Sequence, residues 1–222
     1  MESSRQISAD LQSVLLEKHL NFELLNTYKG VPFICKAILE EVEAEVARFS
    51  LSPASPFAWE TVKYTLILSE GLLEPIEARL VSFDREAGKI WVNNFAYAGS
   101  KLSNRKELRV MPEGDVEVFL ETNGQHVAVS LADLSMRGAG LWIAEELFKA
   151  YGQGKQLNLL LRLPEGEVRL IGRARNITKA SGSARLAVEF LEAKPDKTPI
   201  VRYLMRRRAE IMAEMKRLST GM

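Results

Sequence analysis

From Phe22 onward, the pattern of apolar and polar residues in the first part of the chain is typical of strands. The clearest alternation runs from Ile76 to Phe83, and short apolar runs cover residues 64–68 and 89–93. Residues 84–88, Asp-Arg-Glu-Ala-Gly, are typical of a hairpin turn between two such strands. Strands that follow one another at this spacing without intervening helices predict a small antiparallel barrel.

A second series of strand patterns follows in the later part of the chain. Asn123-Gly124 is typical of a two-residue hairpin turn, and Pro164-Glu165-Gly166 marks a further turn. Around these turns the pattern predicts strands over residues 116–121, 127–131, 140–143, 156–163, 167–176 and 184–190. The later part of the chain is therefore also predicted to be mainly β.

Helical periods are found near the two ends of the sequence. An apolar face predicts a short amphipathic helix over residues 7–20, with Ser8 and Asp10 as candidate caps. A second apolar face predicts a helix over residues 198–218, in which Thr198 is the cap and Pro199 takes the first helical position.

The stretch around Val42 fits two periods. The spacing of Val42, Val46 and Phe49 suits one face of a helix, whereas Val42, Ala44 and Val46 alternate as in a strand. We favour two strands with a turn near Glu41.

A small, polar segment over residues 98–104 is typical of a linker. It predicts an N-terminal domain over residues 1–102 and a C-terminal domain over residues 103–222. The predicted fold class is mainly β, with two small antiparallel β-barrels and a helix at each end of the chain.

Composition and charge narrow the function classes. The formal net charge is +1, with 27% charged residues, and this balance does not favour nonspecific binding to nucleic acid. The one cysteine, Cys35, excludes a disulfide within the chain and is typical of a reducing compartment. Residues 1–20 lack the apolar segment of a signal peptide, and no run approaches the roughly 18 apolar residues of a membrane span. We therefore expect a cytoplasmic protein.

Two short motifs carry the candidate ligand chemistry. The first is Arg105-Lys106-Glu107-Leu108-Arg109, and the second is Asp133-Leu134-Ser135-Met136-Arg137-Gly138, followed closely by Gly140. Arginine is planar and permanently charged, so it can pair with the O6 and N7 edge of guanine or clamp a phosphate. A carboxylate can accept hydrogen bonds from the ring N–H and the amine of guanine. Both motifs together favour an anionic, guanine-like ligand.

Several of these residues also fit a purely structural role. Asp133 and Ser135 suit a turn, because both residue types form hydrogen bonds to nearby backbone. Arg105 and Arg109 also fit a solvated charge pair in a linker. A glycine at position 138 suits a backbone that needs a positive φ or a close approach.

In this order, the two motifs resemble the signature of the PilZ family, whose members are cyclic di-GMP receptors. Gly172-Arg173-Ala174-Arg175 and Leu186-Ala187-Val188-Glu189-Phe190 also resemble strands of that family, with Ala187 in place of its usual glycine. The resemblance covers roughly residues 103–217 and implies a barrel followed by a terminal helix.

The resemblance implies a nucleotide-binding receptor for this second messenger, with no catalytic residue, metal or cofactor. The implied ligand-binding residues are Arg105, Arg109, Asp133, Ser135 and Gly138. A second group of candidates consists of Lys106, Arg137, Gly140, Arg173 and Arg175. Binding at the linker would change the orientation of the domains and signal to a protein partner with an output in motility, polysaccharide synthesis or a related process.

The first part of the chain resembles the split-barrel domain that precedes PilZ in flagellar-brake proteins of the YcgR type. The alternating hairpin from Ile76 to Asn93, with Ser82-Phe83-Asp84 before its turn, carries this resemblance. It implies a protein of two barrels.

Three alternatives remain open. The PilZ-like barrel fits a protein adaptor that binds no nucleotide, and a split barrel fits an FMN-dependent oxidoreductase. The basic Arg206-Arg207-Arg208 triplet fits a nucleic-acid contact through the terminal helix. An enzyme is not favoured, since His19, His126 and Cys35 are scattered and the sequence has no phosphate-loop, C-x-x-C, H-E-x-x-H or G-x-S-x-G motif.

Overall fold

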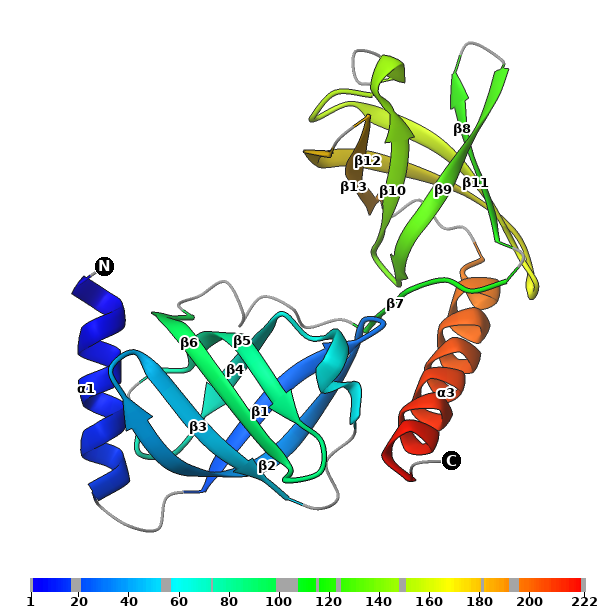
Figure 1. Ribbon diagram of the computed structural model, residues 1–222. Helices are drawn as coiled ribbons and strands as arrows, with labels where there is room; N and C mark the ends of the chain where they lie inside the picture. The colour runs from blue at the N-terminus through cyan, green and yellow to red at the C-terminus, as the bar shows by residue number, and fades with distance from the viewer. Residues whose placement is uncertain are drawn as a thin grey trace. The chain divides into compact units, whose positions relative to one another are not determined.

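The computed structural model describes residues 2–16, 21–52, 57–72, 74–98, 108–114, 116–122, 125–147, 151–180, 182–191 and 196–220 (Figure 1). The chain divides into two compact units. Unit 1 consists of Met1–Tyr28, Pro32–Lys106 and Met212–Met222, and unit 2 consists of Lys29–Val31 and Glu107–Ile211. Apart from Ala98, the predicted linker over residues 98–104 lies outside the described residues, and so does the predicted domain boundary after residue 102.

Unit 1 contains a closed six-stranded barrel, so the prediction of a barrel in the first part of the chain is confirmed (Figure 1). Its strands pair in the order β1-β2-β3-β6-β5-β4. Their bounds are β1 Phe22–Tyr28, β2 Val31–Glu43, β3 Val46–Leu51, β4 Tyr64–Leu68, β5 Ile76–Asp84 and β6 Lys89–Tyr97.

Alternate side chains of these strands fill the barrel with apolar groups. Along β2, burial alternates residue by residue from Val31 to Leu39, as a strand with one face inside a barrel requires. Phe22 and Phe49 meet edge to face with their ring centroids 5.5 Å apart. The fully buried Trp59, in the short 3₁₀ helix η1 (Phe57–Thr61), packs edge-on against Phe33.

The expected turn near Glu41 is wrong. The turn lies at Ala44 and Glu45, and Ala44 adopts a positive φ of 50°. Between Leu39 and Glu41 the pairing of β2 with β3 shifts by one residue in a β-bulge. The bulge puts Leu39 and Val42, three residues apart, both inside the barrel, and β2 continues past Glu41 to Glu43.

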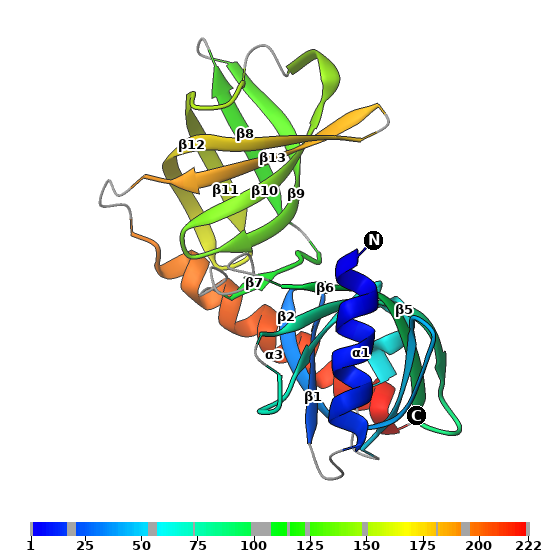
Figure 2. The same cartoon turned by 90° about the vertical axis from the view of Figure 1, so that its left-hand side faces the viewer.

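The first helix, α1, runs from Glu2 to Leu16 and lies beside β6 (Figure 2). It begins earlier than predicted, so Ser8 lies inside the helix, where it is buried, and neither Ser8 nor Asp10 caps it. The predicted apolar face is confirmed at Ile7 and Leu11, which are fully buried. Asp10 instead accepts a hydrogen bond of 2.7 Å from the hydroxyl of Tyr97 on β6. Residues 17–20 of the predicted helix lie outside the described residues.

Unit 2 contains the second predicted barrel (Figure 2). Its strands follow one another in the order β10-β13-β12-β11-β8-β9, and pairing of β9 with β10 closes the ring. A two-residue strand, β7 (Arg109–Val110), adds to β9. The ring strands are β8 Glu117–Thr122, β9 Gln125–Ser135, β10 Gly138–Ala144, β11 Gln156–Leu163, β12 Gly166–Ala180 and β13 Ser183–Phe190. A short 3₁₀ helix, η2 (Glu145–Leu147), follows β10.

The interior of this barrel is set by the alternation that the sequence shows. In β13, Leu186, Val188 and Phe190 are buried, while the residues between them lie on the outer face. Asn123-Gly124 lies outside the described residues, but Thr122 pairs with Gln125, so β8 and β9 are joined by a two-residue connection. The outer face of β13 carries the charged residues Arg185 and Glu189.

The helix α3 (Thr198–Thr220) confirms the predicted helix over residues 198–218. Within unit 2 it contributes the buried side chains of Ile200, Tyr203 and Leu204. Its last residues belong to unit 1, where Tyr28 donates a hydrogen bond of 2.7 Å to the carboxylate of Glu214. No helix in the described part of the chain is long and apolar enough to cross a bilayer.

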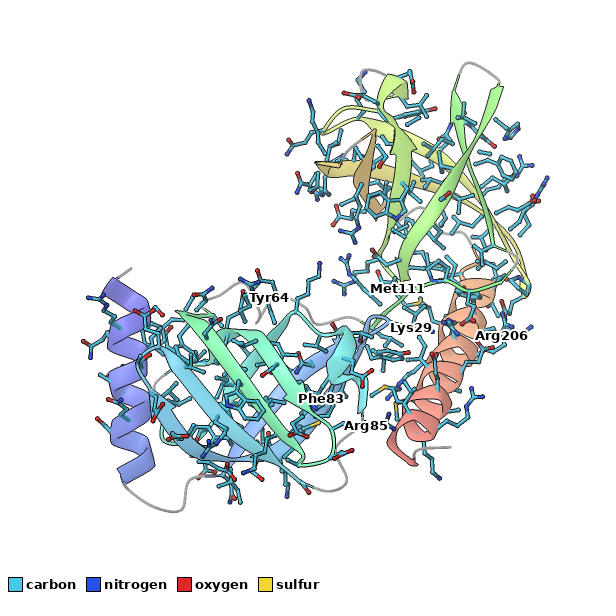
Figure 3. The ribbon with its side chains drawn as sticks, viewed as in Figure 1. Lys29, Tyr64, Phe83, Arg85, Met111 and Arg206 are labelled. Atoms are coloured by element: carbon cyan, nitrogen blue, oxygen red, sulfur yellow. The ribbon has the colours of Figure 1, made fainter. Side chains whose placement is uncertain are left out.

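A buried arginine joins α3 to the segment after β7. The guanidinium of Arg207 donates to the carbonyl of Met111 at 3.0 Å and contacts the carboxylates of Glu113 at 2.5 Å and Glu210 at 3.1 Å. Its side chain is only 4% exposed. Met111 and Arg206, the neighbour of Arg207, are labelled in Figure 3.

We expect Arg207→Ala to lower the free energy of unfolding by roughly 1–3 kcal/mol, because a buried, charge-assisted hydrogen bond to a carbonyl is lost. Arg207→Lys should lose less, since it keeps the charge but not the planar fork. Urea unfolding followed by circular dichroism measures both, with the exposed Arg208→Ala as the matched control. Equal stability of Arg207→Ala and Arg208→Ala would contradict the idea that Arg207 holds α3 against the segment after β7.

Candidate functional site

The second motif lies where β9 has three neighbouring strands. The first part of β9 pairs with β8, and its last residues pair with β10 on one side and with β7 on the other. Asp133 is directly opposite Gly140 on β10, and Gly140 is opposite Ala187 on β13. Paired residues share a face of a sheet, so these three positions all lie on the outer face of the barrel.

Asp133 is held between two arginines. Nη1 of Arg109 on β7 donates to Oδ1 of Asp133 at 3.3 Å, and Nη2 of Arg185 on β13 donates to Oδ2. The Asp133 side chain is 12% exposed, against 51% for Arg109 and 40% for Arg185. One shielded carboxylate therefore shares two more exposed guanidinium groups, and the three residues together carry one positive charge.

Ser135 holds the turn between β9 and β10. Its hydroxyl donates to the carbonyl of Gly138 at 3.1 Å and accepts from the backbone N–H of Arg137 at 3.4 Å. The residue is 1% exposed, and the carbonyl of Arg137 accepts a hydrogen bond of 2.7 Å from the N–H of Phe190. Of the two roles that the sequence left open for Ser135, the bond to the loop backbone is the one present here.

The two glycines of this turn are needed for close approach, and neither has a positive φ. A Cβ on Gly138 would overlap the carbonyl oxygen of Val188 in the backbone of β13. A Cβ on Gly140 would instead overlap the carboxylate of Asp133 and crowd the guanidinium of Arg185. The missing side chain at Gly140 thus provides the space in which Asp133 and Arg185 meet.

The other predicted site residues are either outside the described part of the chain or on neighbouring strands and turns. Arg105 and Lys106 lie outside the described residues, and Arg109 is part of β7. Arg137 is exposed at the turn, and Arg173 and Arg175 are exposed on β12. The pairing of β12 with β13 shifts between Ala174 and Asn176, and Arg175 forms an ion pair with Glu189 on β13. The structure therefore brings together Arg109, Asp133, Ser135, Gly138 and Gly140.

Arg185 is not among the residues predicted from the sequence. The signal was present in the alternation of β13, which places Arg185 outside, two residues before Ala187. Its contact with Asp133 could not be seen, because it depends on β10 lying between β9 and β13. Trp142, 42% exposed, is directly opposite Arg185 and adds an aromatic ring to the same outer face.

Other features of the described residues lie apart from this site. A depression of about 540 Å³ on the same unit is lined by Gly114, Val116, Glu117, Arg162, Leu163 and Pro164. It contains no residue of the second motif. In the part of the chain that the structure describes, no group of three or more His, Cys, Asp or Glu side chains could hold a metal ion.

Comparison with protein families identifies the second barrel. Residues 103–206 match the model of the PilZ domain. These residues form a PilZ domain. The match includes both sequence motifs, β7 to β13 and the first part of α3, so the predicted PilZ resemblance is confirmed. No curated protein sequence is significantly similar to the chain.

Several solved structures align with most of the chain. MrkH of K. pneumonia in complex with c-di-GMP has 16% sequence identity and a TM-score of 0.47, over 98% of this chain and 97% of MrkH. The motility inhibitor MotI (DgrA) of Bacillus subtilis has 12% identity and a TM-score of 0.45, over 87% of this chain and 96% of that chain. YcgR of Escherichia coli, also in complex with c-di-GMP, has 15% identity and a TM-score of 0.43, over 98% and 96%.

Replacing Gly138 or Gly140 with alanine should lower stability by different amounts. We expect Gly138→Ala to lower the free energy of unfolding by about 1–3 kcal/mol, because a backbone carbonyl of β13 cannot move without disturbing the ladder. Gly140→Ala should cost less, since the ends of two side chains can rotate away. Chemical unfolding of both variants, followed by circular dichroism, measures the difference. A Gly138→Ala protein as stable as the wild type would contradict the close approach.

Proposed function

We propose that this protein is a receptor for cyclic di-GMP and that the nucleotide binds on the outer face of the PilZ barrel beside Asp133. One observation carries the proposal: within a PilZ domain, a shielded carboxylate is held between Arg109 and Arg185. The proposed site is formed by the residues that the sequence motifs predicted, Arg105, Arg109, Asp133, Ser135 and Gly138. Lys106, Arg137, Gly140, Arg173 and Arg175 stay secondary candidates.

The chemistry of these groups suits a guanine nucleotide. The carboxylate of Asp133 can accept two hydrogen bonds from the ring N–H and the amine of one guanine base. Arginine matches either the O6 and N7 edge of guanine or a phosphate, with two parallel hydrogen bonds in each case. The turn held by Ser135 provides a fixed wall, because its hydroxyl is already bound to the backbone at Gly138.

Ligand binding requires an exchange of partners at Asp133. With only 12% of its side chain exposed, the carboxylate can receive a base only if an arginine gives up part of its contact. The arginine that is displaced then becomes a donor to the ligand. In this proposal the protein acts as a cytoplasmic receptor, without a catalytic residue or cofactor.

Calorimetric titration of cyclic di-GMP into the full-length protein tests the proposal. We expect saturable binding that Arg109→Ala and Asp133→Ala each weaken by one to two decades, since a charge-assisted contact contributes roughly 1.5–3 kcal/mol. Arg169→Ala is the matched control, because Arg169 lies on β12 with its side chain 73% exposed, beside Glu167. Absence of binding at cyclic di-GMP concentrations up to about a millimolar would refute the receptor function and favour a protein adaptor. A dissociation constant of that size corresponds to a binding free energy of roughly −4 kcal/mol.

We also propose that binding changes the orientation of the two barrels and that this change signals to a protein partner. The reason lies in the sequence: Arg105 belongs to the segment that joins the barrels, so a ligand bound by Arg105 and Asp133 would restrict that segment. A ligand shifts such an equilibrium only by its difference in affinity for the two arrangements.

Small-angle X-ray scattering of the protein with and without cyclic di-GMP measures this change. We expect the scattering curve of the wild type to change on saturation and that of Arg105→Ala to change much less at a saturating ligand concentration. Calorimetry under the same conditions confirms that both proteins are occupied. Superimposable wild-type curves with and without bound ligand would rule out the change in orientation.

A further inference from the structure

We propose that Arg185 is a further ligand-binding residue, which supplies a guanidinium group to a phosphate of the nucleotide. Neither motif includes it, and the inference rests on the proposed function. Three observations support it: the position of Arg185 on the outer face, the charge balance of that face, and the way Asp133 holds the guanidinium.

The first observation is position. Arg185 lies on β13, opposite Trp142 of β10 and Thr178 of β12. To contact Asp133 on β9, its side chain reaches across β10, and it passes over the position where Gly140 has no side chain. The guanidinium therefore lies directly beside the residue that is proposed to bind guanine.

The second observation is charge. The ion pairs of this outer face join Arg109 and Arg185 to Asp133, and Arg175 to Glu189. Within these ion pairs three guanidinium groups share two carboxylates, so the paired groups together carry one positive charge. An anionic group bound beside Asp133 would neutralise it, and each phosphate of cyclic di-GMP carries one negative charge.

The third observation is orientation. A guanidinium has five N–H donors in a planar fork, and the contact with Oδ2 of Asp133 involves Nη2. With 40% of the side chain exposed, the group is both accessible and held in one direction by its carboxylate. A donor that is already oriented loses less conformational entropy on binding than a freely rotating one.

A purely structural role makes a different prediction. If Arg185 only orients Asp133, which keeps Arg109 as its cation, a side chain that donates a hydrogen bond to the carboxylate should restore binding. If Arg185 contacts a phosphate, the positive charge is what matters. Glutamine keeps a donor without the charge, whereas lysine keeps the charge without the fork.

The experiment is calorimetric titration of cyclic di-GMP into the full-length wild type, Arg185→Lys, Arg185→Gln and Arg185→Ala, with Arg169→Ala as the control. We expect Arg185→Ala and Arg185→Gln to weaken binding at least tenfold at low salt, and Arg185→Lys to weaken it less than fivefold. The deficit of Arg185→Gln should narrow at about 1 M salt, where the Debye length is only about 3 Å. Arg169→Ala should bind like the wild type. Circular dichroism checks that each variant is folded.

Several outcomes would overturn the inference while the proposed function stands. Wild-type affinity in Arg185→Gln would assign Arg185 to the positioning of Asp133, and tighter binding by Arg185→Ala would make it a competitor of the ligand. A deficit that is the same at low and high salt would also exclude a phosphate contact. If the wild type itself does not bind, the proposed function fails first, and the inference fails with it.

Discussion

A carboxylate that is largely shielded from water must be paired with positive charge, and the outer face of the PilZ barrel is organised around this requirement at Asp133. A shielded, unpaired charge is costly, and removing one partner of such a pair costs more than the pair contributes. Asp133 meets the requirement with two arginines from two different strands. One comes from β7, which is only two residues long, and the other reaches across β10. The glycine at position 140 follows from the same requirement, because a side chain there would occupy the space of the ion pair.

This arrangement separates a rigid part of the site from a part that can rearrange. The turn after β9 is fixed by the Ser135 hydroxyl and by the close approach of Gly138 to β13. A backbone hydrogen bond from the N–H of Phe190 to the carbonyl of Arg137 fixes it further. By contrast, the side chains of Arg109 and Arg185 are 51% and 40% exposed, and each has several rotatable bonds. Most of the rearrangement on ligand binding would therefore occur in side chains, while the backbone of the turn keeps its geometry.

The sequence predicted those features that depend on local patterns. Strict alternation revealed β13 and its buried Leu186, Val188 and Phe190, and the spacing of apolar residues revealed α3. Errors arose where a local pattern was interrupted: the bulge after Leu39 breaks the alternation of β2 near Glu41, where the turn was predicted, and α1 begins before its apolar face. β7 is too short to produce any period. The role of Arg185 could not be predicted, because it depends on the order of strands around the barrel, and strand order is a long-range property.

The division of α3 between the two units has a consequence for how the chain folds as it is synthesised. Unit 1 includes β1 to β6 and also residues 212–222. Within it, the hydroxyl of Tyr28 donates a hydrogen bond to the carboxylate of Glu214. The ribosome makes these last residues only after the whole PilZ barrel has been translated. The first barrel can form its ring of strands early, yet its complete set of contacts is available only after the second barrel has left the ribosome. Unit 1 is therefore the first of the two units to begin to be translated and the second to be completed.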